Sequence, residues 1–285
     1  MVVPFASGGS TDLLARTLAE AAGKKIGQSV VVTNVVGASG TVGSAQVASA
    51  EADGYTLMFV TSAPLTIQPY FMQGLTYNTD SYTYLCNVAS EATCIAVRAD
   101  SPYQTLDDLL KAGKSGKELS LGNTGVGTLH YLFQQELFGK AGASYKQVAF
   151  EGGAKLVTGL LGGNVDAIST VVSEMYDYVK DGQIRILAVS SEKRSSLYPD
   201  IPTVKESGYD VNMSLDFFVV APKNLPDDVK KTLTDAFAEA VKADSLTQYL
   251  NNANIASNYM DSDVLKSKVT SDAEMYKKIV DSIQK

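Results

Sequence analysis

Short apolar runs alternate with helical patterns along most of this chain, and this alternation limits the possible folds more than any other feature. The runs with the length and composition of buried strands are Val2–Phe5, Val30–Thr33, Thr56–Val60, Tyr84–Val88, Cys94–Val97, Leu119–Gly122, Gln147–Phe150, Val165–Ser169, Ile184–Val189 and Phe217–Ala221. Between many of them lie the helical segments Thr11–Lys24, Val42–Ala50, Leu106–Ala112, Thr128–Phe138, Ala154–Leu161 and Glu174–Lys180. Strands and helices at this spacing form parallel β-α-β units. The sequence therefore predicts an α/β fold in which helices cover mainly parallel sheets.

The length of the chain, 285 residues, suits one large domain or two lobes of roughly 100–150 residues each. No long flexible linker and no internal repeat is visible, so two lobes would be joined by extended crossing segments. We place these crossings near Val97–Ser101 and Leu215–Phe217. The first lobe then consists of 1–98 and 217–285 and the second lobe of 99–216, and the tail from Pro226 onward is predicted to be almost purely helical.

The composition argues against several classes of partner. The net charge is −7 and charges of both signs are interspersed, so the chain lacks the basic stripe that binds nucleic acid or anionic membranes. No stretch of about 20 apolar residues is present that would span a membrane. The sequence enters a strand pattern at once, and we identify no signal peptide in it. No cluster of His, Cys and carboxylates suits a metal ion, and we expect neither a metal nor another cofactor.

The two cysteines, Cys86 and Cys94, are too few for a disulfide scaffold. They also lack the C-x-x-C spacing of zinc and redox sites. Two interpretations stay open at this point. The cysteines are buried free thiols, or they form one local disulfide across neighbouring strands, which would fit an oxidising compartment.

A glycine-rich turn follows the first predicted strand. The segment Pro4–Asp12, PFASGGSTD, passes through Gly8 and Gly9 into a helix that begins near Ser10. Glycines allow close approach to the backbone, and a helix N-terminus presents free N–H groups and the positive end of its dipole. The pattern therefore predicts an anion site, although an ordinary tight turn shares it. Asp12 is favoured in a first helical turn by the dipole, and its functional interpretation is a partner for a ligand amine or hydroxyl.

A second glycine-rich turn, Asn34–Gly43, again joins a strand to a helix. Its glycines follow G-x-x-G-x-x-G rather than the G-x-G-x-x-G fingerprint of dinucleotide sites, and it lacks the Gly-Lys-Ser/Thr of a P-loop. Both turns stand at the carboxyl ends of strands, and in an α/β sheet such ends meet at one edge. We therefore expect the two turns to lie side by side and to hold one carboxylate.

Further turns of this kind fall in the second lobe. Asn123–His130 joins a strand to a helix through glycines and hydroxyl residues. The glycines of Phe150–Gly153 and Gly162–Asp166 also read simply as helix caps. His130 is the only histidine and falls about one turn into a helix, where a core or surface role is expected.

Enzymatic functions find little support in these residues. A serine hydrolase needs a base, and one histidine at a helix start offers no recognisable triad. The chain has no G-x-S-x-G elbow, and no pair of carboxylates stands out for acid–base work. Hydroxyls, glycines and backbone dipoles without a nucleophile–base pair are typical of binding. We therefore expect a binding protein without catalytic residues.

The string Val3–Arg16, VPFASGGSTDLLAR, closely resembles the opening of the TctC/Bug family, the solute receptors of tripartite tricarboxylate transporters. The resemblance continues in order along nearly the whole chain, through Asn34–Gly43, Ala52–Leu57, Gly125–His130, Gly152–Ala154, Leu160–Asp166, Leu187–Val189, Pro199–Thr203 and Glu206–Gly208. Such an ordered match is far more specific than any single glycine loop. One departure is that the family usually has a tryptophan near the second crossing, where this chain has Asp216–Phe218 and no tryptophan at all.

The resemblance implies two α/β lobes of the periplasmic-binding-protein type, joined by two hinge crossings, with the ligand between them. Family members take up carboxylates, and the first two loops are described as holding a ligand carboxylate through backbone groups, hydroxyls and ordered water. Carried over to this chain, it predicts ligand-binding residues in both lobes: Phe5, Ser7, Gly8, Gly9, Asp12, Ala38, Ser39, Gly40, Thr61, Ser62, Gly127, Thr128, Ser169 and Thr170.

We therefore expect an extracytoplasmic solute-binding protein that captures a small organic carboxylate by hinge closure. It would deliver this ligand to integral-membrane subunits of a tripartite tricarboxylate-type transporter. We expect it to act as a monomer in the periplasm, either free or lipid-anchored. The alternatives are a receptor that signals to a membrane sensor and an α/β enzyme that acts on a carboxylate.

Overall fold

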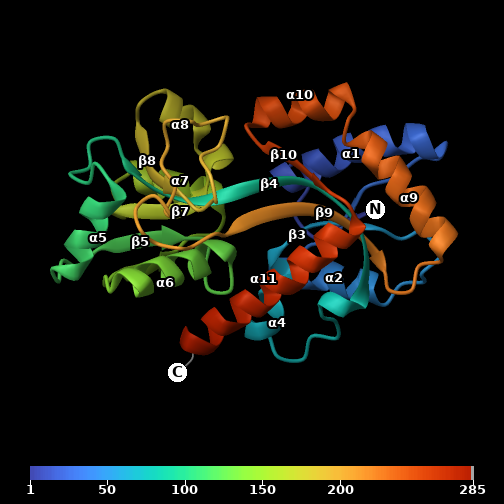
Figure 1. Ribbon diagram of the computed structural model, residues 1–285, viewed down its shortest axis with the longest axis horizontal. Helices are drawn as coiled ribbons and strands as arrows, with labels where there is room; N and C mark the ends of the chain where they lie inside the picture. The colour runs from blue at the N-terminus through green and yellow to red at the C-terminus, as the bar shows by residue number, and fades with distance from the viewer. Residues whose placement is uncertain (284–285) are drawn as a thin grey trace. The chain divides into compact units, whose positions relative to one another are not determined.

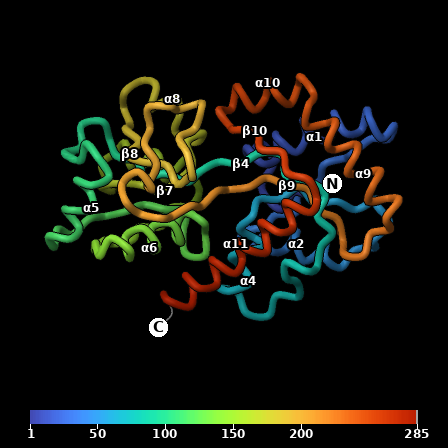
Figure 2. The backbone as a smooth tube through the Cα atoms, in the orientation of Figure 1, coloured from blue at the N-terminus to red at the C-terminus, as the bar shows by residue number. Residues whose placement is uncertain are grey.

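The computed structural model describes residues 1–283, and its chain divides into two compact units. Unit 1 consists of Met1–Ser90 and Asp216–Val280, and unit 2 consists mainly of Glu91–Leu215. The chain therefore leaves unit 1 once and returns to it once, and Figure 2 traces this path by colour. The first division falls within the strand Tyr82–Arg98, and the second falls near the start of the strand Ser214–Pro222. A compact unit does not define where a chain bends, so the hinge positions stay a prediction.

The sheet of unit 1 is built around three short parallel strands (Figure 1). Strand β1 pairs in parallel with β2 and with β3, and β3 pairs antiparallel with β9. A further antiparallel pair joins β10 to the first part of β4. The bounds of these strands are β1 Val2–Val3, β2 Thr33–Asn34, β3 Met58–Thr61, β4 Tyr82–Arg98, β9 Ser214–Pro222 and β10 Ala256–Met260.

Seven α-helices accompany this sheet among the described residues of unit 1: α1 Ser10–Ile26, α2 Thr41–Ala48, α3 Ala63–Thr66, α4 Gln68–Phe71, α9 Asp227–Ala240, α10 Asp244–Ala253 and α11 Ser262–Ile283. Helix α1 packs against α9 and α10. It ends at Gly27, whose φ of 74° is the left-handed conformation that suits a glycine helix cap. The tail beyond Pro226 is thus largely helical as predicted, but strand β10 interrupts it.

The core of unit 1 lies between the sheet and its helices. Met58 and Val60 of β3 and Phe218 of β9 are fully buried and pack in one apolar cluster. Leu265 of α11 belongs to the same cluster. Burying such side chains stabilises the fold by roughly 1.5–3 kcal/mol each. The short strands of unit 1 are therefore held in place chiefly by packing.

Unit 2 has its own sheet. Strand β5 pairs in parallel with β6 and β7, and the second part of β4 pairs antiparallel with β7 and β8. The elements of this unit are β5 Ser120–Asn123, β6 Lys146–Ala149, β7 Ala167–Val171 and β8 Ile184–Val189, with α5 Leu106–Lys114, α6 Leu129–Ala141, α7 Gly153–Leu161 and α8 Tyr176–Lys180. Helix α5 begins with a capping box, in which the side chains of Thr105 and Asp108 accept hydrogen bonds from each other's backbone N–H.

The predicted α/β class is confirmed, while several details differ from the prediction. The sheets are mixed, because β4, β8, β9 and β10 add antiparallel pairs to the parallel ones. The two runs Tyr84–Val88 and Cys94–Val97 form a single strand, β4, since the polar residues between them do not break its extended backbone.

The single strand also decides between the two interpretations of the cysteines. Cys86 and Cys94 are free and buried. They lie eight positions apart on β4, so an extended backbone separates them by about 26 Å. A disulfide across neighbouring strands is therefore wrong, because the two residues are not on neighbouring strands and are too far apart to bond.

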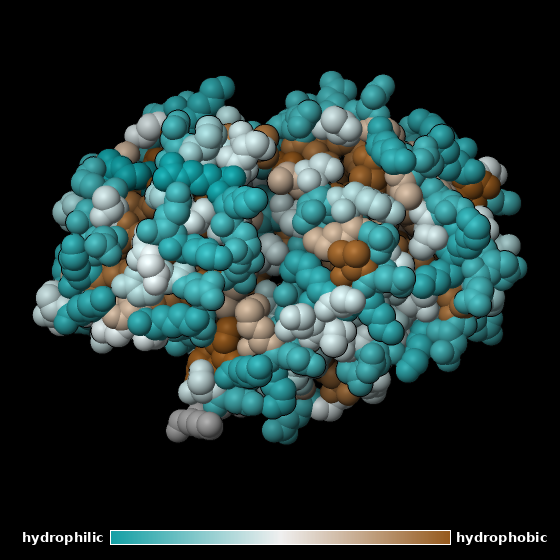
Figure 3. Space-filling view, in the orientation of Figure 1, coloured by the Kyte–Doolittle hydropathy of each residue, from teal (hydrophilic) through white to brown (hydrophobic). Residues whose placement is uncertain are grey.

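Hydrophilic side chains cover most of the face seen in Figure 3. The large apolar side chains that are exposed, such as Val31, Tyr55 and Val126, come from separate parts of the sequence. No helix within residues 1–283 is both long and apolar enough to cross a membrane.

Candidate functional site

The first predicted loop is organised by the carboxylate of Asp12, which is only 1% exposed. Its Oδ2 accepts hydrogen bonds from the backbone N–H of Gly8 at 2.9 Å and from Arg16 Nε at 3.0 Å. Its Oδ1 accepts from Asn34 Nδ2 at 2.8 Å. The Ser7 hydroxyl lies 3.5 Å from Oδ2. Asp12 therefore ties the loop to α1 and to the end of β2.

The electrostatics of Asp12 fit this role. Desolvation raises the pKa of its carboxyl, but hydrogen bonds from Arg16, Gly8 and Asn34 outweigh that effect and lower the pKa to about 2. The carboxylate is thus charged at neutral pH and already satisfied by donors of the protein. Asn34 adds a second tie, because its Nδ2 also donates to the Phe5 carbonyl at 3.0 Å. Sequence reasoning did not single out Asn34 or Arg16, although Asn34 comes directly after a strand.

The second predicted loop has an unusual backbone. Ala38 and Ser39 have φ values of 45° and 54°, between Gly37 at 155° and Gly40 at 89°. Positive φ is uncommon for residues other than glycine. Such conformations cluster at functional sites, and successive N–H groups in left-handed turns form concavities that bind anions. The loop is therefore the most strained backbone among the predicted site residues.

The two loops and the end of β3 lie against one another within unit 1. A Cβ atom placed on Gly40 would lie 3.4 Å from the Phe5 ring and 2.9 Å from Cγ of Pro64. A Cβ on Gly43 would lie 2.9 Å from Cβ of Pro4. The structure thus brings the predicted residues Phe5 and Gly40 into contact, beside the turn that follows β3.

The helices that start at these loops lack side-chain caps. Helix α1 begins after Gly9 and helix α2 after Gly40, and neither glycine can supply the oxygen that usually accepts from the first turn. The first N–H groups of a helix need such a partner. Two neighbouring helix starts of this kind suit an anion such as a carboxylate.

The third strand end of unit 1 carries Thr61 and Ser62, which are both buried. The Ser62 backbone N–H donates to the Asp216 carbonyl at 3.0 Å. Its hydroxyl is buried and makes no hydrogen bond to any atom of the described chain. A buried hydroxyl without a partner is costly, and it marks a place where water or a ligand fits.

In unit 2, the predicted residues Gly127 and Thr128 belong to a turn that closes on itself. Thr128 is the N-cap of α6, where its hydroxyl donates to the Gly125 carbonyl at 2.7 Å and accepts from the Tyr131 N–H at 3.3 Å. His130 is buried on α6, and desolvation lowers its pKa to about 4. The histidine is therefore a neutral core residue, as expected.

The predicted residues Ser169 and Thr170 end strand β7, and both are buried. Thr170 donates a hydrogen bond to the Glu174 carboxylate. Glu91 lies near Glu174 and is held by Ser173, and desolvation together with the Glu174 charge raises the pKa of Glu91 to about 7. This acidic pair was missed from sequence, because Glu91 and Glu174 stand in different elements and no spacing links them.

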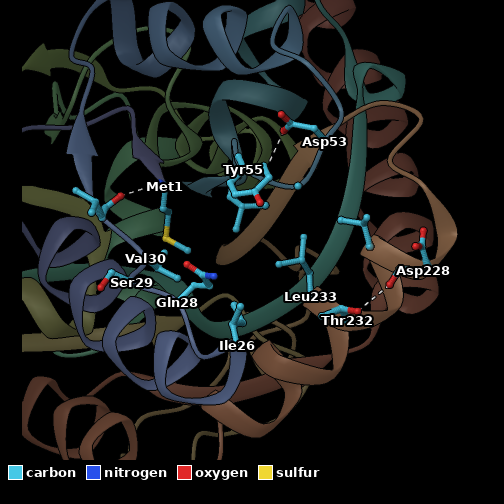
Figure 4. Close-up of a pocket in the computed structure, with 14 residues that line it drawn as sticks. Met1, Ile26, Gln28, Ser29, Val30, Asp53, Tyr55, Asp228, Thr232 and Leu233 are labelled. Atoms are coloured by element: carbon cyan, nitrogen blue, oxygen red, sulfur yellow. Dashed lines mark hydrogen bonds between the residues drawn. The ribbon is translucent and has the colours of Figure 1, made fainter.

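No group of His, Cys, Asp and Glu within residues 1–283 could hold a metal ion. A pocket of about 570 Å³ does lie on unit 1, but it is lined by residues that precede β1, β2 and β3, such as Met1, Val30 and Leu57, together with residues of α9 (Figure 4). It therefore lies at the amino ends of these strands, away from the glycine loops. Asp53 and Asp228 line this pocket, which makes it unsuited to an anion.

Comparisons with known proteins identify the family of this chain. The model of the tripartite tricarboxylate transporter family receptor, TctC, matches residues 14–284. A Cupriavidus necator protein, described as a UPF0065 protein in the gbd 5' region, is 32% identical over 263 residues, which are 92% of this chain and 80% of that protein.

Solved structures give the same result. A TctC solute-binding protein from Polaromonas, without ligand, has a TM-score of 0.87 and 29% identity, over 99% of this chain and 96% of that one. The R. palustris protein Rpa4515, solved with adipate, has a TM-score of 0.85 and 26% identity, over 98% and 95% of the two chains. These relatives confirm the resemblance seen in the sequence and the two-lobed binding-protein fold. The chain belongs to the family of tripartite tricarboxylate transporter receptors, TctC.

Proposed function

We propose that this protein is an extracytoplasmic receptor that captures a small organic carboxylate and delivers it to the membrane subunits of a tripartite tricarboxylate-type transporter. The observation that carries the proposal is the contact between the two uncapped glycine loops, where Gly40 packs against the Phe5 ring. Two helix starts without side-chain caps offer an anion several N–H groups at once. The adipate in a family structure supports an acid as the ligand.

In this proposal the ligand carboxylate lies on the loops of unit 1. The hydroxyls of Ser7 and Ser39 donate to it, and Gly8, Gly9 and Gly40 let it approach the backbone closely because they carry no side chain. Ala38, Thr61, Ser62 and Phe5 complete the wall. We assign Asp12 to the first loop as its organiser, since its oxygens already accept from the protein. Hydrogen bonds to a charged group contribute about 1.5–3 kcal/mol each, so several of them account for specific binding.

The residues of unit 2 complete the proposal. Gly127, Thr128, Ser169 and Thr170 contact the ligand when the protein closes at its two crossings, and closure excludes water. The ligand favours the closed form because it binds that form more tightly. The transporter then recognises the closed, loaded form. Binding with hinge closure needs no chemistry, so the proposal includes no catalytic step. It also places the protein in the periplasm as a monomer.

A thermal-shift screen tests this function directly. The purified protein is heated with succinate, malate, citrate, glutamate, adipate and benzoate in turn. A ligand that binds only the folded protein raises Tm by mass action, and at 100 times Kd the stabilisation is about 2.7 kcal/mol. We expect one class of acid to raise Tm clearly. Silence across the panel, with no acid released from the denatured protein in mass spectrometry, would contradict the proposal.

A further inference from the structure

The two places where the chain passes between its units are joined by a side-chain hydrogen bond inside unit 1. Ser90 is the last residue of unit 1 before the chain enters unit 2, and Asp216 is the first residue after it returns. We refer to the chain at these two divisions as the crossing segments. Ser90 Oγ donates to Asp216 Oδ1 at 2.5 Å. Ser90 Oγ also accepts hydrogen bonds, from Asn87 Nδ2 at 3.1 Å and from Asn258 Nδ2 at 2.9 Å. The hydroxyl therefore uses its whole hydrogen-bonding capacity to connect β4, β9 and β10.

A buried ion pair anchors this connection to the last helix. The Asp216 side chain is 1% exposed, and its Oδ2 lies 2.9 Å from Lys268 Nζ of α11. Lys268 also pairs with Asp272 one turn further along. A buried carboxylate is tolerated only with such partners. The position of Asp216 is thus fixed by β4 on one side and by α11 on the other.

The same aspartate reaches the candidate binding site through its backbone. Its carbonyl accepts the hydrogen bond from the Ser62 N–H at 3.0 Å. Ser62 directly follows β3, is a predicted ligand residue, and has the buried hydroxyl without a partner in the described chain. A shift of Asp216 therefore moves the strand end that carries Ser62.

We propose that Ser90, Asp216 and Lys268 form a latch that holds the two crossing segments to each other and couples their movement to the ligand site at Ser62. The latch keeps the crossings ordered before ligand arrives, so less conformational entropy is lost on binding. Its link to ligand affinity rests on the proposed function, whereas its effect on the crossings does not. Ser90, Asp216 and Lys268 are positioning residues, because none of them contacts the ligand.

Amide hydrogen exchange of the ligand-free protein tests the latch itself. Ser90→Ala removes the bond between the crossings, and Lys268→Met removes the anchor on α11. We expect exchange in both 86–93 and 213–218 to rise about tenfold in each variant, because local opening requires less free energy. Ser49→Ala and Lys266→Met are matched controls, since both residues are exposed and lie outside the network. Unchanged exchange, or a rise in only one of the two segments, overturns the latch.

The second arm measures affinity for the best binder of the acid panel. We expect Ser90→Ala to raise Kd about tenfold while the two control variants keep the wild-type Kd. A tenfold rise in exchange without a change in Kd overturns the coupling to the ligand site. If the wild type binds no acid, the proposed function fails, and the exchange data still decide the latch. If Lys268→Met does not fold, Lys268→Arg replaces it in the exchange experiment. Wild-type exchange in Lys268→Arg, together with raised exchange in Ser90→Ala, then supports the latch.

Discussion

The glycine loops before α1 and α2 in unit 1 and the loop before α6 in unit 2 share one sequence pattern but end in different ways. In unit 1 the helices α1 and α2 start after Gly9 and Gly40, which leave the first N–H groups without a side-chain cap. In unit 2 helix α6 starts after Thr128, whose hydroxyl accepts from the first turn. The pattern of strand, glycines and helix is therefore either an open anion site or a closed turn, and the N-cap residue decides which.

The buried acids of the two units differ in the same sense. Asp12 receives hydrogen bonds from Gly8, Arg16 and Asn34, and its pKa is lowered. Glu91 is held by Ser173 but lies near the Glu174 charge, and its pKa is raised. Burial alone thus does not determine the charge of an acid. Desolvation raises the pKa of both carboxyls, and only at Asp12 do the hydrogen bonds lower the pKa by more than desolvation raises it.

The largest expected effect on ligand affinity comes from closing the open loop of unit 1. In Gly40→Ala the new Cβ lies 2.9 Å from Pro64 Cγ, at a φ of 89° that disfavours alanine. Since Phe5 packs on the same side, the loop has to move away from the position in which it holds a carboxylate. We expect Kd for the acid identified by the screen to rise about 100-fold, which corresponds to about 2.7 kcal/mol, and titration calorimetry measures it.

Gly27→Ala provides the control for this variant. Gly27 has a similar φ of 74°, has open space around its Cβ position and stands at the far end of α1. It therefore carries the backbone strain without the contact. If the Gly40 and Gly27 variants bind the acid with equal affinity, the second loop is not part of the binding site.

The next effect concerns the acid of unit 2. The pKa of Glu91 is raised from its ordinary 4.5 to about 7 in the folded protein. Between these values the folded state binds more protons than the unfolded state, so the free energy of unfolding falls as pH rises through this range and levels off above it. A shift of this size corresponds to about 3 kcal/mol. Glu91→Gln should flatten the pH 5–7 limb in urea denaturation, while an unchanged limb would contradict the assignment.

The fold and the first loops were predictable because they depend on local signals. Apolar runs with helical segments between them predicted strands such as β8. The helix expected over Leu106–Ala112 is present as α5. The glycines at positions 8, 9 and 40 pointed to loops that the structure brings together. These features follow from backbone preferences that act over a few residues.

Features that depend on distant residues were not predictable. Nothing in the sequence links Ser90 to Asp216 or Glu91 to Glu174, because each pair comes together only when the strands assemble. The local sequence also predicted two strands where the structure has the single strand β4. Pairing between strands provides the free energy that keeps such a polar stretch extended, and a window of sequence does not contain the partner strand.

A smaller effect separates the hydroxyls of the two units. Ser39→Ala should cost about 1–3 kcal/mol in binding if the hydroxyl donates to a charged carboxylate, with little change in Tm. Thr128→Ala should instead lower the free energy of unfolding by about 1 kcal/mol, because it removes the cap of α6. Calorimetry and thermal melts on both variants check this division. A Thr128 variant that keeps the wild-type Tm would contradict the capping role of this hydroxyl.

The smallest effect is expected for Asp12 in acid. Its folded pKa of about 2 lies below the ordinary 3.8, so the stability that it contributes is present above about pH 4 and is lost as pH falls towards 2. Its partner Arg16 is 45% exposed, and solvent screening limits the contribution to less than about 1 kcal/mol. Asp12→Asn should therefore remove a shallow acid limb from the pH profile of unfolding. At neutral pH it should also weaken ligand binding, because asparagine has a single acceptor oxygen for the three donors that Asp12 satisfies, Gly8, Arg16 and Asn34. A variant with wild-type affinity and a wild-type acid limb would show that Asp12 does not organise the loop.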